Sequence, residues 1–360
     1  MWKIGSGIFL GWALGANDSA NIFGTGVATG TVRYRTAIWL TAIFLMAGAM
    51  LEGPKCMQSL GELSRLIPLE AFCVALAAAG TMTVLTVLAL PASASQAIVG
   101  AILGAGVLAG TADFTRLYRI VACWVLTPIC GLILGYLLHR CIGWLLDRTV
   151  RRLTHRNFIY LAGIVVSGCY GAYSLGSNNV ANVTGVYVGA ALLSAQTAAV
   201  VGGLSIALGV LTYSRRVMMT VGKGIVPLDP FSALVVVLAE AMTLHLFTQV
   251  GVPVSSSQAV VGAVVGVGLM GDVHTISTRM LLKIALGWIG TPLAAGLMAV
   301  ALILGLEAVA PFWQQYVGPL LEQLGMAEAF STAVQFWGDW LRWMMNALSG
   351  ISAACLTEKR

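Results

Sequence analysis

Long runs of apolar residues fill most of this 360-residue chain, and short polar clusters interrupt them at a few places. Many of the runs approach the ~20 residues that an α-helix needs to cross the hydrocarbon core of a bilayer. A transmembrane barrel would instead show alternating apolar and polar residues in segments of about 10 residues. The pattern therefore predicts an all-α polytopic membrane protein.

The polar clusters belong to an internal repeat, because three landmarks occur twice in the same order. They are GANDSAN at 15–21 and GSNNVAN at 176–182, PASASQ at 91–96 and PVSSSQ at 253–258, and WVLTP at 124–128 and WIGTP at 288–292. The distance between the copies drifts only from 161 to 164 residues. The chain is therefore predicted to contain two related transmembrane halves, 1–148 and 157–306, joined by a basic cytoplasmic linker at 149–156.

The distribution of charge predicts the orientation of each half. The loop after the first helix carries Arg33 and Arg35 in the first half, whereas the equivalent loop near 190–196 is uncharged. After the second helix the bias reverses, to a net charge of −1 over 52–70 and +2 over 215–229. Because Lys and Arg concentrate in cytoplasmic loops, the two halves are predicted to be inverted relative to each other, as in many secondary transporters.

A consistent tracing puts the N-terminus outside and the Arg33 loop inside. Pro91 and Pro253 each fall at a break between apolar runs. Each region is either two crossings or a re-entrant hairpin with its tip at the serine–glutamine segment, so broken or re-entrant helices are expected. The amphipathic segment 307–360 has no repeat partner, and its part 330–356 is either a last crossing or a surface helix.

Composition agrees with this class of protein. Hydrophobic residues make up 58% of the chain and charged residues only 9%, whereas a soluble protein has about 25% charged residues. The net charge of +6 lies largely in loops, which indicates membrane topology rather than nucleic-acid binding. A multi-pass protein of the plasma (inner) membrane is expected.

The first pair of motifs suggests a cation site. Asp18 is the only acid within them, and an aspartate in an apolar helix costs several kcal/mol unless it is compensated. A small hard cation compensates it directly, because such ions bind carboxylate, amide and carbonyl oxygens. Sodium is the expected ion, and flanking glycines would let the helix break and expose carbonyls. The predicted sodium ligands are Asn17, Asp18, Asn178 and Asn179; alternatively, the asparagines only tie helices together.

The second pair of motifs suggests an anion site. A proline break followed by a helix leaves free backbone N–H groups at the positive end of the helix dipole. Two such helix starts that approach from opposite sides would surround a tetrahedral oxyanion; the alternative is ordinary capping by serine. The predicted anion ligands are Ser93, Ser95, Gln96, Ser255, Ser256, Ser257 and Gln258, with Asn21 and Asn182. Glu240, in an apolar run, either binds a cation, carries a proton or is buried with a polar partner.

At these residues the chain resembles the inorganic phosphate transporter (PiT) family of cation-coupled secondary transporters. The resemblance covers about residues 10–305 and also includes VMMTVGKGI at 217–225. It implies cation-coupled uptake of inorganic phosphate, a helical inverted-repeat fold and often a homodimer. Two departures bear on the ions: many members carry Asp where this chain has Asn179, and His where it has Gln96 and Gln258.

The expected function is sodium-coupled symport of inorganic phosphate. Phosphate near pH 7 carries a proton and needs an acceptor, whereas sulfate offers only acceptor oxygens, so a buried site can discriminate between them. Sulfate or another tetrahedral oxyanion is the first alternative, since the family also contains proteins that look like sulfate carriers. An anion channel is the second. No cluster of residues suits catalysis, so an enzyme is not expected, and sodium is the only expected cofactor-like ion.

Overall fold

The computed structural model describes residues 2–28, 30–87, 92–224, 229–270, 278–312 and 315. Within this part the chain forms a 3-10 turn and a series of α-helices. In chain order these are η1 Trp2–Ile4, α1 Gly5–Ala28, α2 Tyr34–Glu52, α3 Pro54–Gly61, α4 Pro68–Val87, α5 Ala94–Ala109, α6 Phe114–Thr149, α7 Leu153–Gly189, α8 Ala195–Gly224, α9 Pro230–Val250, α10 Ser256–Gly268 and α11 Thr278–Phe312. Pro91 and the predicted helix at 330–356 lie outside the described residues.

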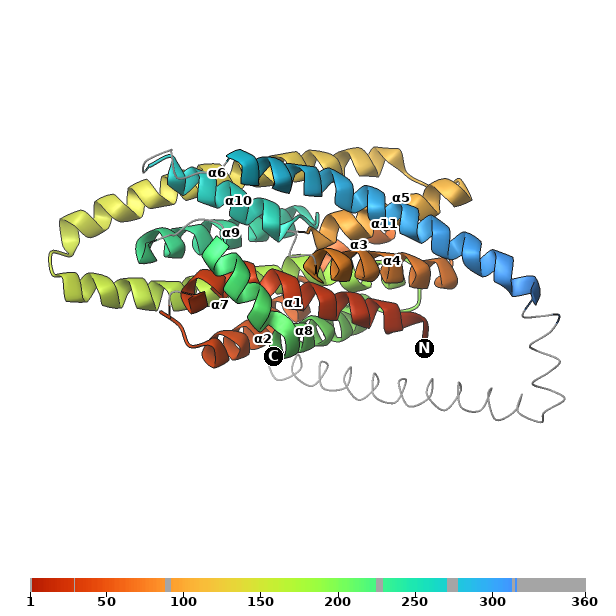
Figure 1. Ribbon diagram of the computed structural model, residues 1–360, viewed down its shortest axis with the longest axis horizontal. Helices are drawn as coiled ribbons and strands as arrows, with labels where there is room; N and C mark the ends of the chain where they lie inside the picture. Colours follow the sequence, from red (N-terminus) through yellow and green to blue (C-terminus); the bar gives the residue numbers. More distant parts are fainter. Residues whose placement is uncertain are drawn as a thin grey trace, which may run out of the picture.

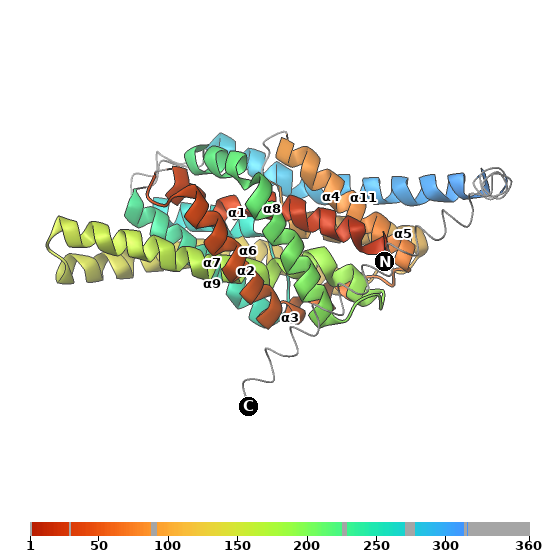
Figure 2. The same cartoon turned by 90° about the horizontal axis from the view of Figure 1, so that it is seen from below.

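Seven of these helices are long and apolar enough to cross a membrane: α2, α4, α6, α7, α8, α9 and α11. They confirm the prediction of a helical multi-pass membrane protein. α1 has 24 residues, which is also long enough to span, although it carries the polar GANDSAN segment. α6, α7 and α11 lie roughly along the long axis of the molecule, whereas α2 and α8 cross it obliquely (Figure 2). The α6–α7 pair projects at one end of the molecule and α11 at the other (Figures 1 and 2).

The two serine–glutamine segments lie in helical hairpins. α6 and α9 are antiparallel, since Arg119 donates to the Val250 carbonyl near one end and His139 contacts Ser232 near the other. α10 runs parallel to α6, with Gly262 against the backbone of Pro128. The chain therefore reverses between α9 and α10, at Gly251 with φ 76°.

The first half shows the same reversal. The Ser64 hydroxyl, just before α4, lies 2.9 Å from the Thr111 hydroxyl, just after α5. α5 and α10 have 16 and 13 residues, or about 24 and 20 Å at 1.5 Å per residue. Both are shorter than the ~30 Å hydrocarbon core, so of the two expected arrangements the structure has the hairpin.

The halves exchange equivalent contacts. A Cβ added at Gly15 in α1 would collide with the backbone of Ile206 in α8, and one at Gly176 in α7 would collide with Leu45 in α2. These two contacts correspond when 161 is added to each residue of the first half. α5 likewise packs on α11, and α6 packs on α10. The two halves are thus interwoven rather than separate bodies.

Equivalent segments of the two halves also run antiparallel. Near one end of α1, Ser6 and Tyr187 of α7 form a 2.8 Å hydrogen bond. Near the other end, Phe23 packs against Gly168, earlier in α7. Antiparallel equivalent segments agree with the predicted inverted repeat. The orientation of each half in a membrane, and the domain limits 1–148, 149–156 and 157–306, stay predictions.

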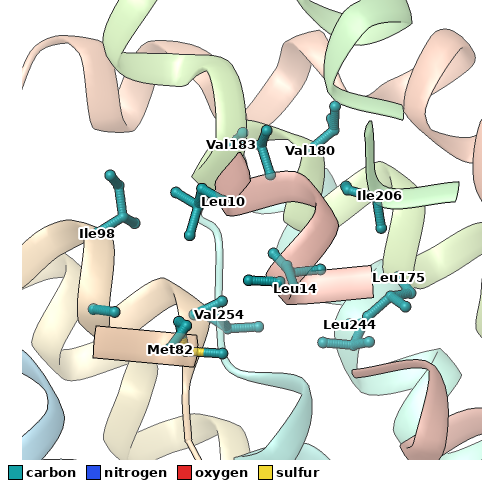
Figure 3. Packing of buried hydrophobic residues seen from close by; sticks show 14 of the residues in the cluster. Leu10, Leu14, Met82, Ile98, Leu175, Val180, Val183, Ile206, Leu244 and Val254 are labelled. Atoms are coloured by element: carbon teal, nitrogen blue, oxygen red, sulfur yellow. The ribbon is translucent and has the colours of Figure 1, made fainter. Parts of the chain in front are cut away.

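The apolar core lies where the halves meet. Figure 3 shows side chains from both halves pointing into one cluster. Leu10 and Leu14 of α1, Met82 of α4 and Ile98 of α5 meet Leu175, Val180 and Val183 of α7, Ile206 of α8, Leu244 of α9 and Val254. Close van der Waals packing at this junction stabilises the pairing of the halves, and the polar motifs lie on the same helices.

Candidate ion and anion site

The asparagine motifs lie on unbroken helices. α1 is continuous from Gly5 to Ala28 and α7 from Leu153 to Gly189, so the expectation that flanking glycines break these helices is wrong. Gly15 and Gly176 instead allow another helix to approach so closely that a Cβ would collide with its backbone. Side-chain atoms, rather than released backbone carbonyls, are therefore the groups that these motifs offer.

The serine motifs begin α5 and α10 in the same way. The Ser93 hydroxyl accepts a 3.3 Å hydrogen bond from the Gln96 N–H, and the Ser255 hydroxyl accepts one of the same length from the Gln258 N–H. Both serines are thus N-caps, as the capping alternative predicted. Ser257 lies 2.8 Å from Ser255, hydroxyl to hydroxyl.

The two helix starts lie beside each other. Ser95 donates to the Val254 carbonyl at 2.8 Å, and the equivalent Ser257 donates to the Ala92 carbonyl at 3.4 Å. Two positive helix ends therefore converge in one buried region, an arrangement that favours negative charge.

Each asparagine motif meets the serine motif of the other half. The Asn182 amide donates to Ser95 at 2.8 Å, and the Asn21 amide donates to Ser256 at 3.2 Å. Ser256 in turn donates to Asp18 Oδ2 at 3.0 Å. The structure thus brings together the predicted cation ligands and the predicted anion ligands. Asp18, Asn182, Ser95 and Ser256 are all buried.

Asn17 and Asn178 make structural hydrogen bonds. Asn17 donates to Thr86 Oγ1 at 2.8 Å, and the equivalent Asn178 donates to the equivalent Thr248 Oγ1 at 3.1 Å. Asn178 also accepts a 2.8 Å bond from the Val254 N–H. These contacts tie α1 to α4 and α7 to α9. The role of both asparagines as sodium ligands stays a prediction.

Several buried polar atoms around the junction have no hydrogen-bond partner. They are Asp18 Oδ1, Asn179 Nδ2, Asn182 Oδ1, Gln96 Oε1, Gln258 Oε1 and both carboxylate oxygens of Glu240. The side-chain oxygen of Asn179, Oδ1, accepts a hydrogen bond from the Asn182 amide at 2.7 Å. Most of these atoms are oxygens, which are the ligands that a hard cation prefers, so the residues present fit a sodium ion.

The two buried acids, Asp18 and Glu240, lie close enough for their negative charges to repel each other. Glu240 is 1% exposed and Asp18 2% exposed, and their charges interact. Among the residues that the structure describes, neither carboxylate belongs to an ion pair. Two buried carboxylates without basic partners carry a large desolvation cost, which a bound cation or a proton would offset.

Sequence reasoning missed two further pairs of residues. Thr86 and Thr248 bind the motif asparagines, and their positions differ by 162 residues, as do those of the proline motifs. Trp124 and Trp288 have buried indole N–H groups without partners, although both stood in a recognised landmark. Repetition of a polar residue at the repeat distance was the signal that could have found all four.

Comparisons with known proteins agree with this geometry. A family model described as "Phosphate transporter family" matches residues 14–164 and 151–299. A Methanocaldococcus jannaschii protein assigned as a phosphate permease is 27% identical over 80% of this chain and 91% of its own length. The sulfate permease CysP of Bacillus subtilis is 27% identical over 79% of this chain and 82% of its own length.

A solved structure has the same fold. It is titled "The sodium-dependent phosphate transporter" and superposes with a TM-score of 0.75 at 21% sequence identity. The match covers 85% of this chain and 98% of the other. The fold of the described residues is therefore that of a transporter.

Proposed function

Because the chain belongs to the phosphate transporter family, we propose that it is a sodium-coupled symporter of inorganic phosphate. One observation carries the proposal: the acid and amide groups of each asparagine motif lie beside a serine-capped helix start of the other half. The family and the fold are those of transporters rather than enzymes. The relatives assigned to phosphate and the sodium-dependent structural neighbour support the choice of both ions.

Sodium would bind among the buried oxygens of the junction. Asp18 Oδ1 and the Glu240 carboxylate supply negative charge, and the amide oxygens of Asn179 and Asn182 complete a neutral set. The anion would bind at the starts of α5 and α10, through backbone N–H groups and the Ser255 hydroxyl. The hydroxyls of Ser95 and Ser257 would join once they turn away from the Val254 and Ala92 carbonyls, to which they donate here. Sodium then neutralises the acids before the anion arrives.

Ser256 is the physical link between the two ions. Its hydroxyl has one proton to donate, and that proton goes to Asp18 in this conformation. A sodium ion on Asp18 competes for the carboxylate, which releases the Ser256 proton toward the anion. Each ion thereby raises the affinity for the other, and this coupling is reciprocal. Transport follows when one half rocks against the other.

Sulfate transport is the second candidate function, and the similarity to a sulfate permease favours it. The sites for the two anions need the same donors, but only phosphate brings a proton. A channel would take up either anion only down its own gradient, whereas a symporter accumulates it against that gradient when sodium flows inward. We also propose that the protein is a homodimer, as the resemblance implies, and that it lies in the plasma membrane.

Uptake into proteoliposomes tests the proposal. Labelled phosphate and labelled sulfate are offered separately, with an inward sodium gradient or with choline in place of sodium. We expect phosphate accumulation that needs sodium in the wild type, and loss of that dependence in Asp18→Asn. Accumulation with equal rates in choline, or Asp18→Asn with unchanged sodium dependence, would refute sodium coupling at Asp18. Preferential uptake of sulfate would assign the second function.

A further inference from the structure

The repeated WxxTP landmark contains two tryptophans whose indole N–H groups have no hydrogen-bond partner among the described residues. Trp124 lies in α6, four residues before Pro128, and Trp288 lies in α11, four residues before Pro292. The indole N–H of each is buried and has no hydrogen-bond partner. A buried donor without a partner costs about 1–3 kcal/mol, and the same omission at two equivalent positions points to a ligand.

The register of the helices places a glutamine next to each tryptophan. In the parallel pair α6–α10, Gly262 packs on Pro128 and Gly266 packs on Leu132. One turn earlier, the same register puts Gln258 beside Trp124.

The pair α5–α11 repeats this arrangement. Gly100 packs on Pro292 and Gly104 packs on Gly296, so one turn earlier Gln96 lies beside Trp288. Each pair takes its glutamine from one half and its tryptophan from the other.

The side-chain oxygen of each glutamine also lacks a partner within the described part of the chain, although a backbone N–H in the same helix start could donate to it. Gln96 and Gln258 stand at the N3 position of a capping box, in which the N3 side chain normally returns to the N–H of the N-cap residue. The caps Ser93 and Ser255 accept their bonds, but neither glutamine oxygen returns one. Both glutamines are 3% exposed. Each pair therefore presents one free donor, the indole N–H, and one free acceptor, the amide oxygen.

We propose that the two tryptophan–glutamine pairs select a protonated tetrahedral oxyanion, such as hydrogen phosphate, over sulfate. This inference rests on the proposed function. Anionic oxygens of hydrogen phosphate accept from the indole N–H groups, and its single P–OH group donates to one of the two glutamine oxygens. Sulfate has oxygens for the indole but no proton for the amide, so its binding leaves the acceptor unpaired. A site with a buried acceptor rejects an analogue without the matching donor.

Anion binding to the purified full-length chain separates the two roles. One variant combines Gln96→Met with Gln258→Met, which keeps side-chain length and removes the acceptor. Isothermal titration with phosphate and with sulfate, in saturating sodium, gives both dissociation constants. We expect the phosphate constant to rise about tenfold, the effect of roughly one lost hydrogen bond, and the sulfate constant to stay unchanged.

A second variant combines Trp124→Phe with Trp288→Phe, which removes the indole donors and keeps an aromatic ring at each position. We expect it to weaken both anions by a similar factor, because both accept from the indole. Trp39→Phe is the matched control, since Trp39 is 59% exposed, and it should change neither constant. Thermal unfolding of each variant in sodium without anion verifies that it is folded, and single substitutions replace a double variant that is not.

The outcomes distinguish this inference from the function on which it rests. If the glutamine variant binds both anions more weakly by the same factor, the glutamines only contribute packing, and the selectivity argument is overturned. So would unchanged constants in that variant, or a wild type that prefers sulfate. A wild type that binds and transports neither anion would overturn the proposed function together with this inference.

Discussion

Glu240 offers the sharpest test of the electrostatics of the site. It is 1% exposed, and both carboxylate oxygens lack a hydrogen-bond partner. An unsatisfied buried polar group costs about 1–3 kcal/mol, and more when it is charged. Glu240→Gln keeps the volume and removes the charge, so without sodium the variant should be about 2 kcal/mol more stable than the wild type.

The sodium response should change in the opposite direction. A ligand at 100 times its dissociation constant stabilises the folded state by about 2.7 kcal/mol. If the Glu240 carboxylate contributes to the cation site, Glu240→Gln weakens sodium binding. The variant then loses most of the stabilisation that bound sodium provides. A change of 1 kcal/mol moves the Tm by about 2–4 °C in domains of moderate size. The variant should therefore melt several degrees higher than the wild type in choline, and sodium should raise its Tm by less than half as much.

Thermal unfolding in detergent, with a titration of sodium against choline at constant ionic strength, measures both effects. Glu307→Gln is the matched control, because Glu307 is an exposed acid in α11, and its curves should follow those of the wild type. The reasoning fails if Glu240→Gln is less stable than the wild type in choline. That result would mean that the carboxylate has a hydrogen-bond donor or a basic group beside it. It fails equally if the rise in Tm with sodium is unchanged.

Two other perturbations test the architecture of the protein. Asn178→Ala removes a donor to Thr248 and the acceptor of the Val254 N–H, so it should cost about 2–4 kcal/mol. Asn17→Ala removes the donor to Thr86 and should cost about 1 kcal/mol; equal losses of thermal stability would contradict this ranking. Single cysteines at Arg33 and Ala195 should react with impermeant reagents from opposite sides of the membrane, and labelling of both from one side would disprove the inverted topology.

The sequence predicted which residues are polar and buried, but not which of them meet. The repeat distance identified the asparagine and serine motifs as equivalent pairs, and their burial follows from their place in apolar helices. The linear pattern does not show that Asn182 binds Ser95 of the other half rather than Ser257 of its own half, which is nearer in sequence. That choice depends on the interwoven packing of α1 with α8 and of α2 with α7, which is a property of the whole fold.

The glycines explain why one expectation about local structure was wrong. Glycine lowers helix propensity by about 1 kcal/mol, so from the sequence alone the glycines that flank the motifs, such as Gly15 and Gly176, are expected to break a helix. In a membrane, a broken helix leaves backbone groups unsatisfied, and small residues also let two helices approach closely. The structure uses them for close approach to Ile206 and Leu45. Periodicity within a single helix cannot separate these uses, because the partner helix is absent from the pattern.

The distribution of buried acids between the halves bears on the number of coupling charges. In the first half Asp18 accepts from Ser256, whereas at the equivalent position the neutral Asn179 accepts from Asn182. The motifs therefore hold one carboxylate, not two. Glu240 supplies a buried acid from the second half, so each half contributes one. The negative charges of Glu240 and Asp18 repel each other. Two buried negative charges without basic partners must be neutralised before an anion joins them. Under the proposed function, the loaded site therefore needs at least two positive charges, as sodium ions or protons, for every anion.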